Sequence, residues 1–483
     1  MNDYSRPGSI PVFAIIGHPN EGKSSVLSTL AEDDSVRVSP VPGETVACQT
    51  FPVRIDGREV IRFIDTPGFQ NPRATLEWMH RYEGPPERLV AAFRRAHIDD
   101  PGFHDDCELL GPVEAGAGVI FVVDGSRPLR QVDLAEMEVL RLTGAARMAV
   151  INSKEEDTAY LRDWQNEFRK HFNSVRLFNS NRATYAQRIE LLDSLKSIDQ
   201  NLEPVLRRVV EAFQADWGQR NSRSASILVD FFREILVYRK SAPCKQGAEE
   251  QQRLRMQEHF QDYVAQEEHK AHTAIRRLFK HNIFNLELPP QSILAEDVFS
   301  ERTWEFLGLS RGQLIVAGAV GGAALGLGLD AAALGHSLGI ASVIGGIIGA
   351  GATALKGEDF FSGARLLGMQ VGGEQLQVGP VSNVQLLFIL IDRALLFYAH
   401  VINWAHGRRD YEAAGRQAVR QGGKGGKGGK GGYATNWSAE ERRICEHFFV
   451  SVRGGREDVE ERCAALHQLL LKQFARIAGA PFC

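Results

Sequence analysis

The chain has 483 residues, of which 43% are hydrophobic and 24% charged, a length that exceeds one ordinary hydrophobic core and predicts two or three domains. The net charge of -4 excludes a polycationic nucleic-acid binder, and we find no strong nucleic-acid signal elsewhere. No cationic segment followed by an apolar core opens the chain, and the six cysteines lack CxxC spacing, so we expect a cytoplasmic protein with free thiols.

The first predicted strand, PVFAII at 11–16, is followed by the loop GHPNEGKS and by a predicted helix, SVLSTLAE at 25–32. A glycine-rich loop between a buried strand and a helix is the context in which a phosphate-binding P-loop occurs. We therefore predict that this stretch binds a nucleotide through Gly17, His18, Pro19, Asn20, Glu21, Gly22, Lys23, Ser24 and Ser25.

Individual residues of the loop suit different parts of a nucleotide. Gly17 and Gly22 allow the backbone to curl so that successive N–H groups face a phosphate. Lys23 is expected to reach the β- and γ-phosphates, and the Ser24 hydroxyl suits Mg²⁺. A plain turn is the alternative, and the motifs that follow argue against it.

A second predicted strand, IRFIDTPGF at 61–69, ends in the motif DTPG. Asp65 at its tip can hold Mg²⁺ through water, and the Gly68 amide can sense a γ-phosphate. Between the two motifs, Thr45 in VPGET is the candidate switch residue that closes over the metal and the γ-phosphate. Further apolar strands at 118–128 and 147–152, each followed by a predicted helix, indicate a parallel sheet with the nucleotide at its carboxyl ends.

The order GHPNEGKS, PGET, DTPG and VVDGSRP resembles the Era/EngA/MnmE group of translation-factor-class GTPases over residues 10–195. The resemblance implies an α/β P-loop NTPase fold: a Ras-like G domain with a six-stranded, mostly parallel sheet. It also implies a switch that binds GTP and GDP and hydrolyses GTP with Mg²⁺. On this interpretation the catalytic residues are Lys23, Thr45, Gly68 and Asn20, and the metal residues are Ser24, Thr45 and Asp65.

Two positions predict an unusual hydrolysis mechanism. Asn20 stands where potassium-activated members of the group have the asparagine that helps to bind K⁺ beside the phosphates, although an asparagine that only forms a turn is the alternative. Phe69 follows DTPG, where a Ras-like protein has its water-orienting glutamine. A phenyl ring cannot orient water, so we expect hydrolysis to be slow, or to be helped by K⁺, by dimerisation or by a partner.

Base recognition departs from the family pattern. The family's NKxD motif appears here as Asn152-Ser153-Lys154-Glu155, so Asn152 keeps its place and Glu155 replaces the aspartate that recognises guanine. Asp157 is a rival acceptor, and residues 177–184 have no clear match to the family's SAK loop. We expect guanine to be preferred, with poor selectivity over adenine.

The segment between Phe69 and Gly118 is longer than a minimal switch II and its helix. It contains an amphipathic stretch, EWMHRYEGPPERLVAAFRRAH. A partner-responsive lid and an insertion without function are both compatible with this pattern.

The second half of the chain is predicted to be mainly α-helical. Residues 203–240 and 247–281 read as long amphipathic helices packed on one another, and 384–406 as an apolar helix whose Asp392 and Arg393 argue against a membrane span. Ser438 and Glu441 form a capping box that opens a last helical stretch. The predicted divisions are a GTPase domain at 1–198, long helices at 199–310, an apolar hairpin at 311–358, and a helical region at 359–483 with a Gly/Lys linker at 421–432.

The apolar hairpin is the strongest signal for a membrane. Its runs 314–329 and 338–355 repeat glycine at every fourth position, as in Gly318, Gly322 and Gly326, which lets two helices approach closely. At about 1.5 Å per residue the runs reach roughly 24 and 27 Å, short of a hydrocarbon core of about 30 Å. Membrane contact through 314–355 at the cytoplasmic face of the inner membrane, peripheral or integral, is one interpretation. A hairpin buried in protein or in a homo-oligomer is the other.

This layout is similar to a C-terminal domain without assigned function that follows an Era-like GTPase in a group of bacterial proteins. We therefore predict a GTPase switch whose nucleotide state controls a helical, membrane-associated domain. One alternative is a ribosome or RNA assembly GTPase of Era/EngA type, although we find no KH-type GxxG loop. A dynamin-like membrane-remodelling GTPase is the other alternative.

Overall fold

The computed structural model describes residues 10–18, 21–31, 47–152, 159–179, 185–243, 247–279, 294, 298, 299, 303, 370–372, 375–402 and 432–479. The chain divides into two compact units. The first runs to Gln219, and the second begins at Arg220 and holds the described residues up to Val401 and from Gly432 on.

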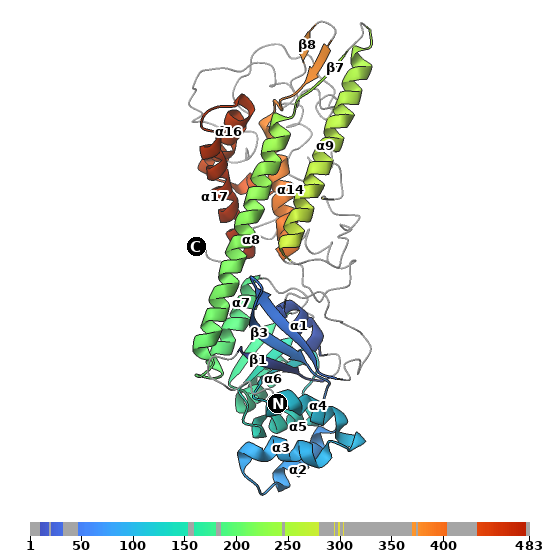
Figure 1. Ribbon diagram of the computed structural model, residues 1–483, viewed down its shortest axis with the longest axis vertical. Coiled ribbons are helices and arrows are strands. Elements are labelled where there is room, and N and C mark those ends of the chain that lie inside the picture. The colour runs from blue at the N-terminus through green and yellow to red at the C-terminus, as the bar shows by residue number, and fades with distance from the viewer. Residues whose placement is uncertain are drawn as a thin grey trace. The chain divides into compact units, whose positions relative to one another are not determined.

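The first unit alternates strands and helices (Figure 1). Its strands are β1 Val12–Ile16, β2 Gln49–Ile55, β3 Arg58–Asp65, β4 Gly118–Asp124, β5 Arg147–Asn152 and β6 Ser174–Phe178. Its helices are α1 Lys23–Ala31, α2 Pro72–Arg81, α3 Leu89–His97, α4 His104–Glu114, α5 Gln131–Leu142, α6 Leu161–His171, α7 Tyr185–Ser194 and the first part of α8 Glu203–Val237. Short 3₁₀ turns lie at Pro86–Arg88, Pro101–Phe103 and Leu195–Ser197.

The six strands form one sheet in the order β2-β3-β1-β4-β5-β6. All neighbours are parallel except β2 and β3, which are antiparallel. The central strands are apolar on both faces because helices cover both faces of a parallel sheet. Asp56 and Gly57, both at positive φ, form the tight turn that makes β2 a hairpin partner of β3. The predicted α/β fold is confirmed.

The two faces of the sheet carry separate cores because successive side chains of a strand point to opposite sides. Phe13 and Ile15 of β1 pack with α1, α7 and the start of α8, whereas Ala14 and Ile16 pack under α2 to α6. The α8 contribution to the first core includes Leu206, Val209, Val210 and Phe213, all buried. The compact unit therefore extends past the predicted boundary at residue 198, because the start of α8 completes its core.

The second unit is mainly helical. Its helices are the rest of α8, α9 Glu249–Leu278, α14 Val384–Ile402, α16 Ala439–Gly454 and α17 Val459–Ala478, with a 3₁₀ turn at Tyr433–Asn436. A small antiparallel sheet joins β7 Lys240–Pro243, β9 Gln375–Val378 and β8 Gln370–Gly372. The two long amphipathic helices predicted from the sequence correspond to α8 and α9.

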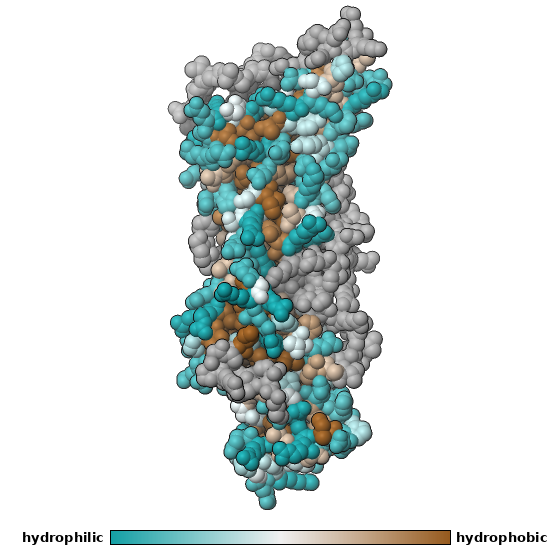
Figure 2. Space-filling model, in the orientation of Figure 1, coloured by the Kyte–Doolittle hydropathy of each residue, from teal (hydrophilic) through white to brown (hydrophobic). Residues whose placement is uncertain are grey.

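Helix α14 is long and apolar enough to cross a membrane by length and composition, with a mean hydropathy of 1.7, yet 83% of it is buried inside the protein. Arg393 in its middle forms a two-pronged ion pair with Glu268 of α9, at 2.7 and 2.8 Å. Asp392 accepts a hydrogen bond from the Ala434 amide at 2.7 Å. Figure 2 shows apolar residues between the hydrophilic outer faces of α8 and α9, where α14 lies. Arg393 thus joins α14 to α9, one of the two long amphipathic helices.

The predicted capping box at the start of α16 is also confirmed. The Ser438 hydroxyl accepts from the Glu441 amide, and the Glu441 carboxylate accepts from the Ser438 amide. Burial opposes ionisation of Glu441, but the Ser438 amide with Lys472 and Arg476 lowers its pKa to about 2. The predicted hairpin at 311–358 lies outside the described residues, as does the Gly/Lys linker up to residue 431.

Candidate nucleotide site

The candidate site lies where four strands end at one edge of the sheet. Strand β1 lies between β3 and β4, and β5 follows, all parallel. The P-loop therefore leaves β1 beside the DTPG motif, which leaves β3, while Asp124 and Asn152 lie at the tips of β4 and β5. Sequence motifs far apart in the chain are thus brought to one edge.

Gly17 opens the P-loop at a position that only glycine can occupy. Its φ is +152°, and a Cβ atom there would lie 2.2 Å from the Val122 carbonyl oxygen of β4. Gly22, with φ of +92°, turns the chain into α1, which begins at Lys23. The free N–H groups at a helix N-terminus favour an anion. The lack of a side chain at Gly17 thus allows the P-loop to lie directly against β4.

The Lys23 side chain is buried within the loop. Its Nζ atom donates to the carbonyl oxygens of Gly17 at 2.8 Å and His18 at 3.1 Å. Burial lowers the pKa of Lys23, and the nearby Asp65 carboxylate opposes this effect. Phosphate oxygens form stronger hydrogen bonds with an ammonium group than carbonyls do, so a phosphate can replace these partners.

Ser24 and Asp65 meet at the predicted metal position. The Ser24 hydroxyl donates to Asp65 Oδ2 at 3.2 Å, and Asp65 is buried. The next residue, Thr66, donates to the Ile15 carbonyl at 2.7 Å and so fastens the tip of β3 to β1. A hydroxyl and a carboxylate are hard oxygen ligands that suit Mg²⁺, so the residues present fit that ion. The described part of the chain holds no group of three or more His, Cys, Asp or Glu suited to another metal.

Asn152 connects the base-recognition side of the site to the P-loop. It is buried, and its Nδ2 atom donates to the Glu21 carbonyl at 3.1 Å. The backbone carbonyl of Asn152 accepts from the Gly125 amide at 3.2 Å, which joins the end of β5 to the loop after β4. Several predicted features lie outside the described residues and stay predictions: Pro19, Asn20, Thr45, Glu155, its rival Asp157, and residues 180–184 of the predicted 177–184 loop.

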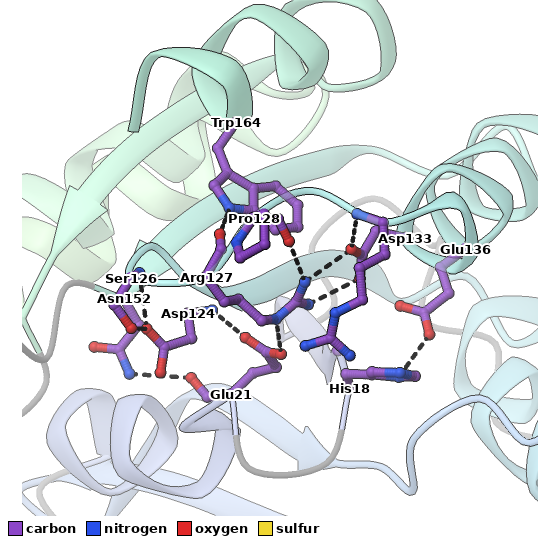
Figure 3. Close-up of polar contacts among 12 residues, drawn as sticks. His18, Glu21, Asp124, Ser126, Arg127, Pro128, Asp133, Glu136, Asn152 and Trp164 are labelled. Atoms are coloured by element: carbon purple, nitrogen blue, oxygen red, sulfur yellow. Dashed lines mark hydrogen bonds and ion pairs between the residues drawn. The ribbon is translucent and has the colours of Figure 1, made fainter. Parts of the chain in front are cut away.

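The sequence did not predict a buried network of charges beside the P-loop (Figure 3). The Glu21 carboxylate accepts from the Asp124 amide and from Arg127 Nε, the latter at 2.5 Å. Arg127 also makes two hydrogen bonds of 2.8 Å to Asp133 at the start of α5. The Trp164 indole donates to the Arg127 carbonyl at 2.8 Å, and the guanidinium lies 4.9 Å from its ring centre. The network joins the P-loop to α5 and α6.

A second ion pair fastens the other side of the loop. His18 Nδ1 lies 2.9 Å from a carboxylate oxygen of Glu136, which is completely buried in α5. The hydrogen bond to Glu136 raises the pKa of His18. A charged residue inside the phosphate loop, such as Glu21, and an arginine after DGS were the available sequence signals for these contacts, but neither signal names its partner.

The long segment after DTPG folds into α2, α3 and α4. Phe69 is buried in the core on that side of the sheet, together with Cys107 and Leu110 of α4. A carbon-only ring buried at this position offers no hydrogen bond to a water molecule.

Two family models match the chain. One, described as "50S ribosome-binding GTPase", matches residues 12–153. The other, described as "Domain of unknown function (DUF3482)", matches residues 165–470, more than half of the chain. The chain belongs to the DUF3482 family. This member combines that domain with an N-terminal P-loop GTPase domain that is similar to GTPase Der.

Individual relatives support the GTPase part. GTPase Der of Agathobacter rectalis is 34% identical over 122 residues, 24% of this chain and 27% of the relative. GTPase Der of Bifidobacterium longum is 27% identical over 219 residues, 45% of this chain and 40% of the relative. The chain thus spans about a quarter to two fifths of the length of these two relatives.

Two solved structures match the chain at low sequence identity. Era in complex with MgGDPNP and part of 16S ribosomal RNA matches with a TM-score of 0.26 and 17% identity, over 49% of this chain and 74% of Era. An S. thermophilus NFeoB mutant bound to GMPPNP matches with a TM-score of 0.23 and 15% identity, over 47% of this chain and 80% of that one.

Proposed function

We propose that this DUF3482 protein binds GTP, hydrolyses it to GDP and phosphate, and uses its nucleotide state to control the helical second unit. The observation that carries the proposal is the meeting of Ser24 and Asp65 at 3.2 Å beside the buried Lys23. A hydroxyl and an ammonium at the N-terminus of a helix, beside a carboxylate at the end of a strand, suit a nucleoside triphosphate with its divalent cation.

Each residue has a separate task in this proposal. Lys23 exchanges its two carbonyl partners for phosphate oxygens, and the amides at the start of α1 bind the same phosphates. Ser24 and Asp65 hold Mg²⁺, which when bound neutralises charge on the β- and γ-phosphates. The Gly68 amide and Thr45 respond to the γ-phosphate, which GDP lacks.

Hydrolysis is proposed to be slow without help. The buried Phe69 cannot position the attacking water, so the charge that develops must be stabilised by another group. The Asn20 side chain is proposed to bind K⁺ for this purpose. The test is phosphate release in KCl and in NaCl at equal ionic strength with Mg²⁺ present. K⁺ should raise the rate in wild type but not in Asn20→Ala, and equal rates in both salts would exclude the potassium role.

Nucleotide binding itself is tested by titrating the full chain with fluorescent GDP and GTP analogues, with ATP as competitor. Lys23→Ala should weaken binding at least about 100-fold, because it removes a charged contact to phosphate. Wild-type protein that binds none of these nucleotides would overturn the proposal. Strong competition by ATP would mean that Glu155 does not select guanine.

We also propose that residues 314–355 contact the cytoplasmic face of a membrane. The repeated glycines and the absence of charge in 314–329 support this proposal. Liposome flotation with GDP and with a non-hydrolysable GTP analogue tests it, using Gly322→Glu against a matched control, Gly218→Glu, at an exposed and open position of α8. Loss of flotation only in Gly322→Glu is expected. If wild type does not float and instead binds RNA or sediments as an oligomer, the membrane proposal is wrong.

A further inference from the structure

The start of α2, directly after the DTPG motif, is held by one buried carboxylate of α4. Asp106 Oδ2 accepts from the amides of Gln70 and Asn71, both at 3.0 Å, and Oδ1 accepts from the Thr75 hydroxyl at 2.8 Å. Asp106 is completely buried. Burial raises its pKa, while the three hydrogen bonds favour the charged form. The amides at the start of a helix have no acceptor within that helix, and the Asn71 side chain does not cap α2. The Asp106 carboxylate supplies the missing acceptor, and its negative charge is favourable at a helix N-terminus.

The hold is reciprocal. The Gln70 side chain donates to the Pro101 carbonyl at 3.0 Å and accepts from the Asp105 amide in the first turn of α4 at 3.4 Å. Asp106 of α4 thus accepts from amides just before α2, and Gln70 just before α2 accepts from an amide of α4. Gln70, which is tied to α4 in both directions, lies two residues after Gly68, whose amide is proposed to sense the γ-phosphate.

The same helix also holds the chain that follows the other switch segment. Glu108 of α4 accepts from the Cys48 amide at 3.0 Å, and the Cys48 thiol donates to the Glu108 carbonyl at 3.4 Å. Cys48 lies three residues after Thr45 and directly before β2. Burial and the neighbouring Glu108 raise the pKa of Cys48 to about 12, so the thiol keeps the proton that it donates.

Helix α4 rests firmly on the core and on α3. Its Cys107, Leu109 and Leu110 side chains are buried against the sheet. Arg94 of α3 donates to the Cys107 carbonyl at 2.8 Å and pairs with Glu114. A change in the position of either switch segment therefore has to move α4, and α3 with it, or break buried hydrogen bonds.

We propose that α4 is a clamp for both nucleotide-responsive segments, with Asp106 and Glu108 as positioning residues that order the segments for GTP. This inference rests on the proposed nucleotide binding and goes beyond it, because it assigns the positioning of the segments that sense the γ-phosphate to residues that touch no nucleotide. Interactions prepared in advance reduce the ordering cost of binding. Only GTP has the γ-phosphate that Gly68 and Thr45 are proposed to contact. Loss of the clamp should therefore lower the affinity for GTP and leave the affinity for GDP unchanged.

The experiment measures the affinities of the full chain for GDP and for a non-hydrolysable GTP analogue, and uses their ratio. Asp106→Ala should lower the affinity for the analogue roughly tenfold, the equivalent of one or two hydrogen bonds, with GDP unchanged. Asp106→Asn keeps an acceptor for the two amides and should restore most of the ratio. Asp105→Asn, which removes the same charge one residue away, should leave the ratio unchanged.

The outcomes separate the clamp from the proposed function. Failure of wild type to bind GDP and the analogue defeats the function itself. If wild type binds both but Asp106→Ala leaves the ratio unaltered, or weakens both nucleotides equally, the clamp is wrong. Should Asp106→Ala fail to fold, Thr75→Val removes one donor at constant shape and must lower the same ratio by about twofold to threefold. An unchanged ratio in that variant would equally overturn the clamp.

Discussion

Both units bury charged side chains, but they place them differently. In the first unit one group of buried charges surrounds an irregular loop, where Glu21 joins the P-loop to Arg127 and His18 joins it to Glu136. In the second unit one buried pair, Arg393 and Glu268, lies in the middle of two helices. Burying charge is expensive unless the group is paired. In the first unit the buried pairs hold a loop that is proposed to bind an anion. In the second unit the buried pair determines which helix faces meet.

The largest effect is expected from breaking the helix pair. Arg393→Met leaves Glu268 buried without its cation, which should destabilise the second unit by about 3–5 kcal/mol. Denaturant unfolding measures this loss. The double variant with Glu268→Met should recover most of it, and nucleotide binding should not change. A single variant as stable as wild type would show that the pair does not hold α14.

A pH-dependent effect is expected at the neighbouring residue. Burial raises the pKa of Asp392 from 3.8 to about 7, although the amides of Ala434 and Tyr433 oppose it. The folded state therefore holds this proton more tightly than the unfolded state, and stability should fall as the pH rises from 4 to 7.

The variant Asp392→Asn keeps the acceptor for Ala434 and cannot ionise, so it should lose this pH slope. At roughly 1.4 kcal/mol per pKa unit, it should be more stable than wild type above pH 7 by up to about 4 kcal/mol. Unfolding at pH 5 and pH 8 gives the comparison. Parallel pH profiles for the two proteins would contradict the raised pKa.

The loop network should respond asymmetrically to substitution. Arg127→Met leaves both Glu21 and the fully buried Asp133 without their cation, which should lower the free energy of unfolding by about 2–3 kcal/mol. Glu21→Val removes one charge and leaves Arg127 paired with Asp133, so the loss should be smaller. GDP affinity and thermal unfolding measure both variants. Equal losses would mean that the network does not position the P-loop.

The smallest effect is expected at His18, which is partly exposed. Its raised pKa means that the pair with Glu136 stabilises the folded state at low pH and that this contribution disappears as the pH rises through the pKa of the folded protein. His18→Gln should therefore be less stable than wild type at pH 6 by under about 1 kcal/mol and nearly equal at pH 8. Thermal unfolding at the two pH values checks this. A larger loss at pH 8 than at pH 6 would reverse the assigned direction.

The sequence predicts the strands and the phosphate loop well because ligand chemistry restricts residues at consecutive positions. Gly17, Lys23 and Ser24 are recognisable from a single stretch, and Asp65 directly follows the apolar residues Phe63 and Ile64 at the end of its strand. The long helices are predictable for a different reason, since apolar residues recur on one face along α8 and α9.

Contacts between distant segments are not predictable in this way. Glu21 and Arg127 lie far apart in the chain, and nothing local indicates that one neutralises the other. Asp106 caps a helix that begins some thirty residues earlier, which depends on how α3 folds between them.

Helix α8 has a practical consequence for anyone who divides this protein into fragments. The apolar side chains at Leu206, Val209 and Phe213 belong to the first unit, and the Tyr185 ring stacks on Trp217 at 3.6 Å. A GTPase fragment cut at residue 198 would lack these side chains, so the core residues that they cover would be exposed to water and would favour aggregation. A fragment that ends at Gln219 keeps these core residues covered. The choice of the last residue therefore decides whether a purified fragment retains the complete core of the first unit.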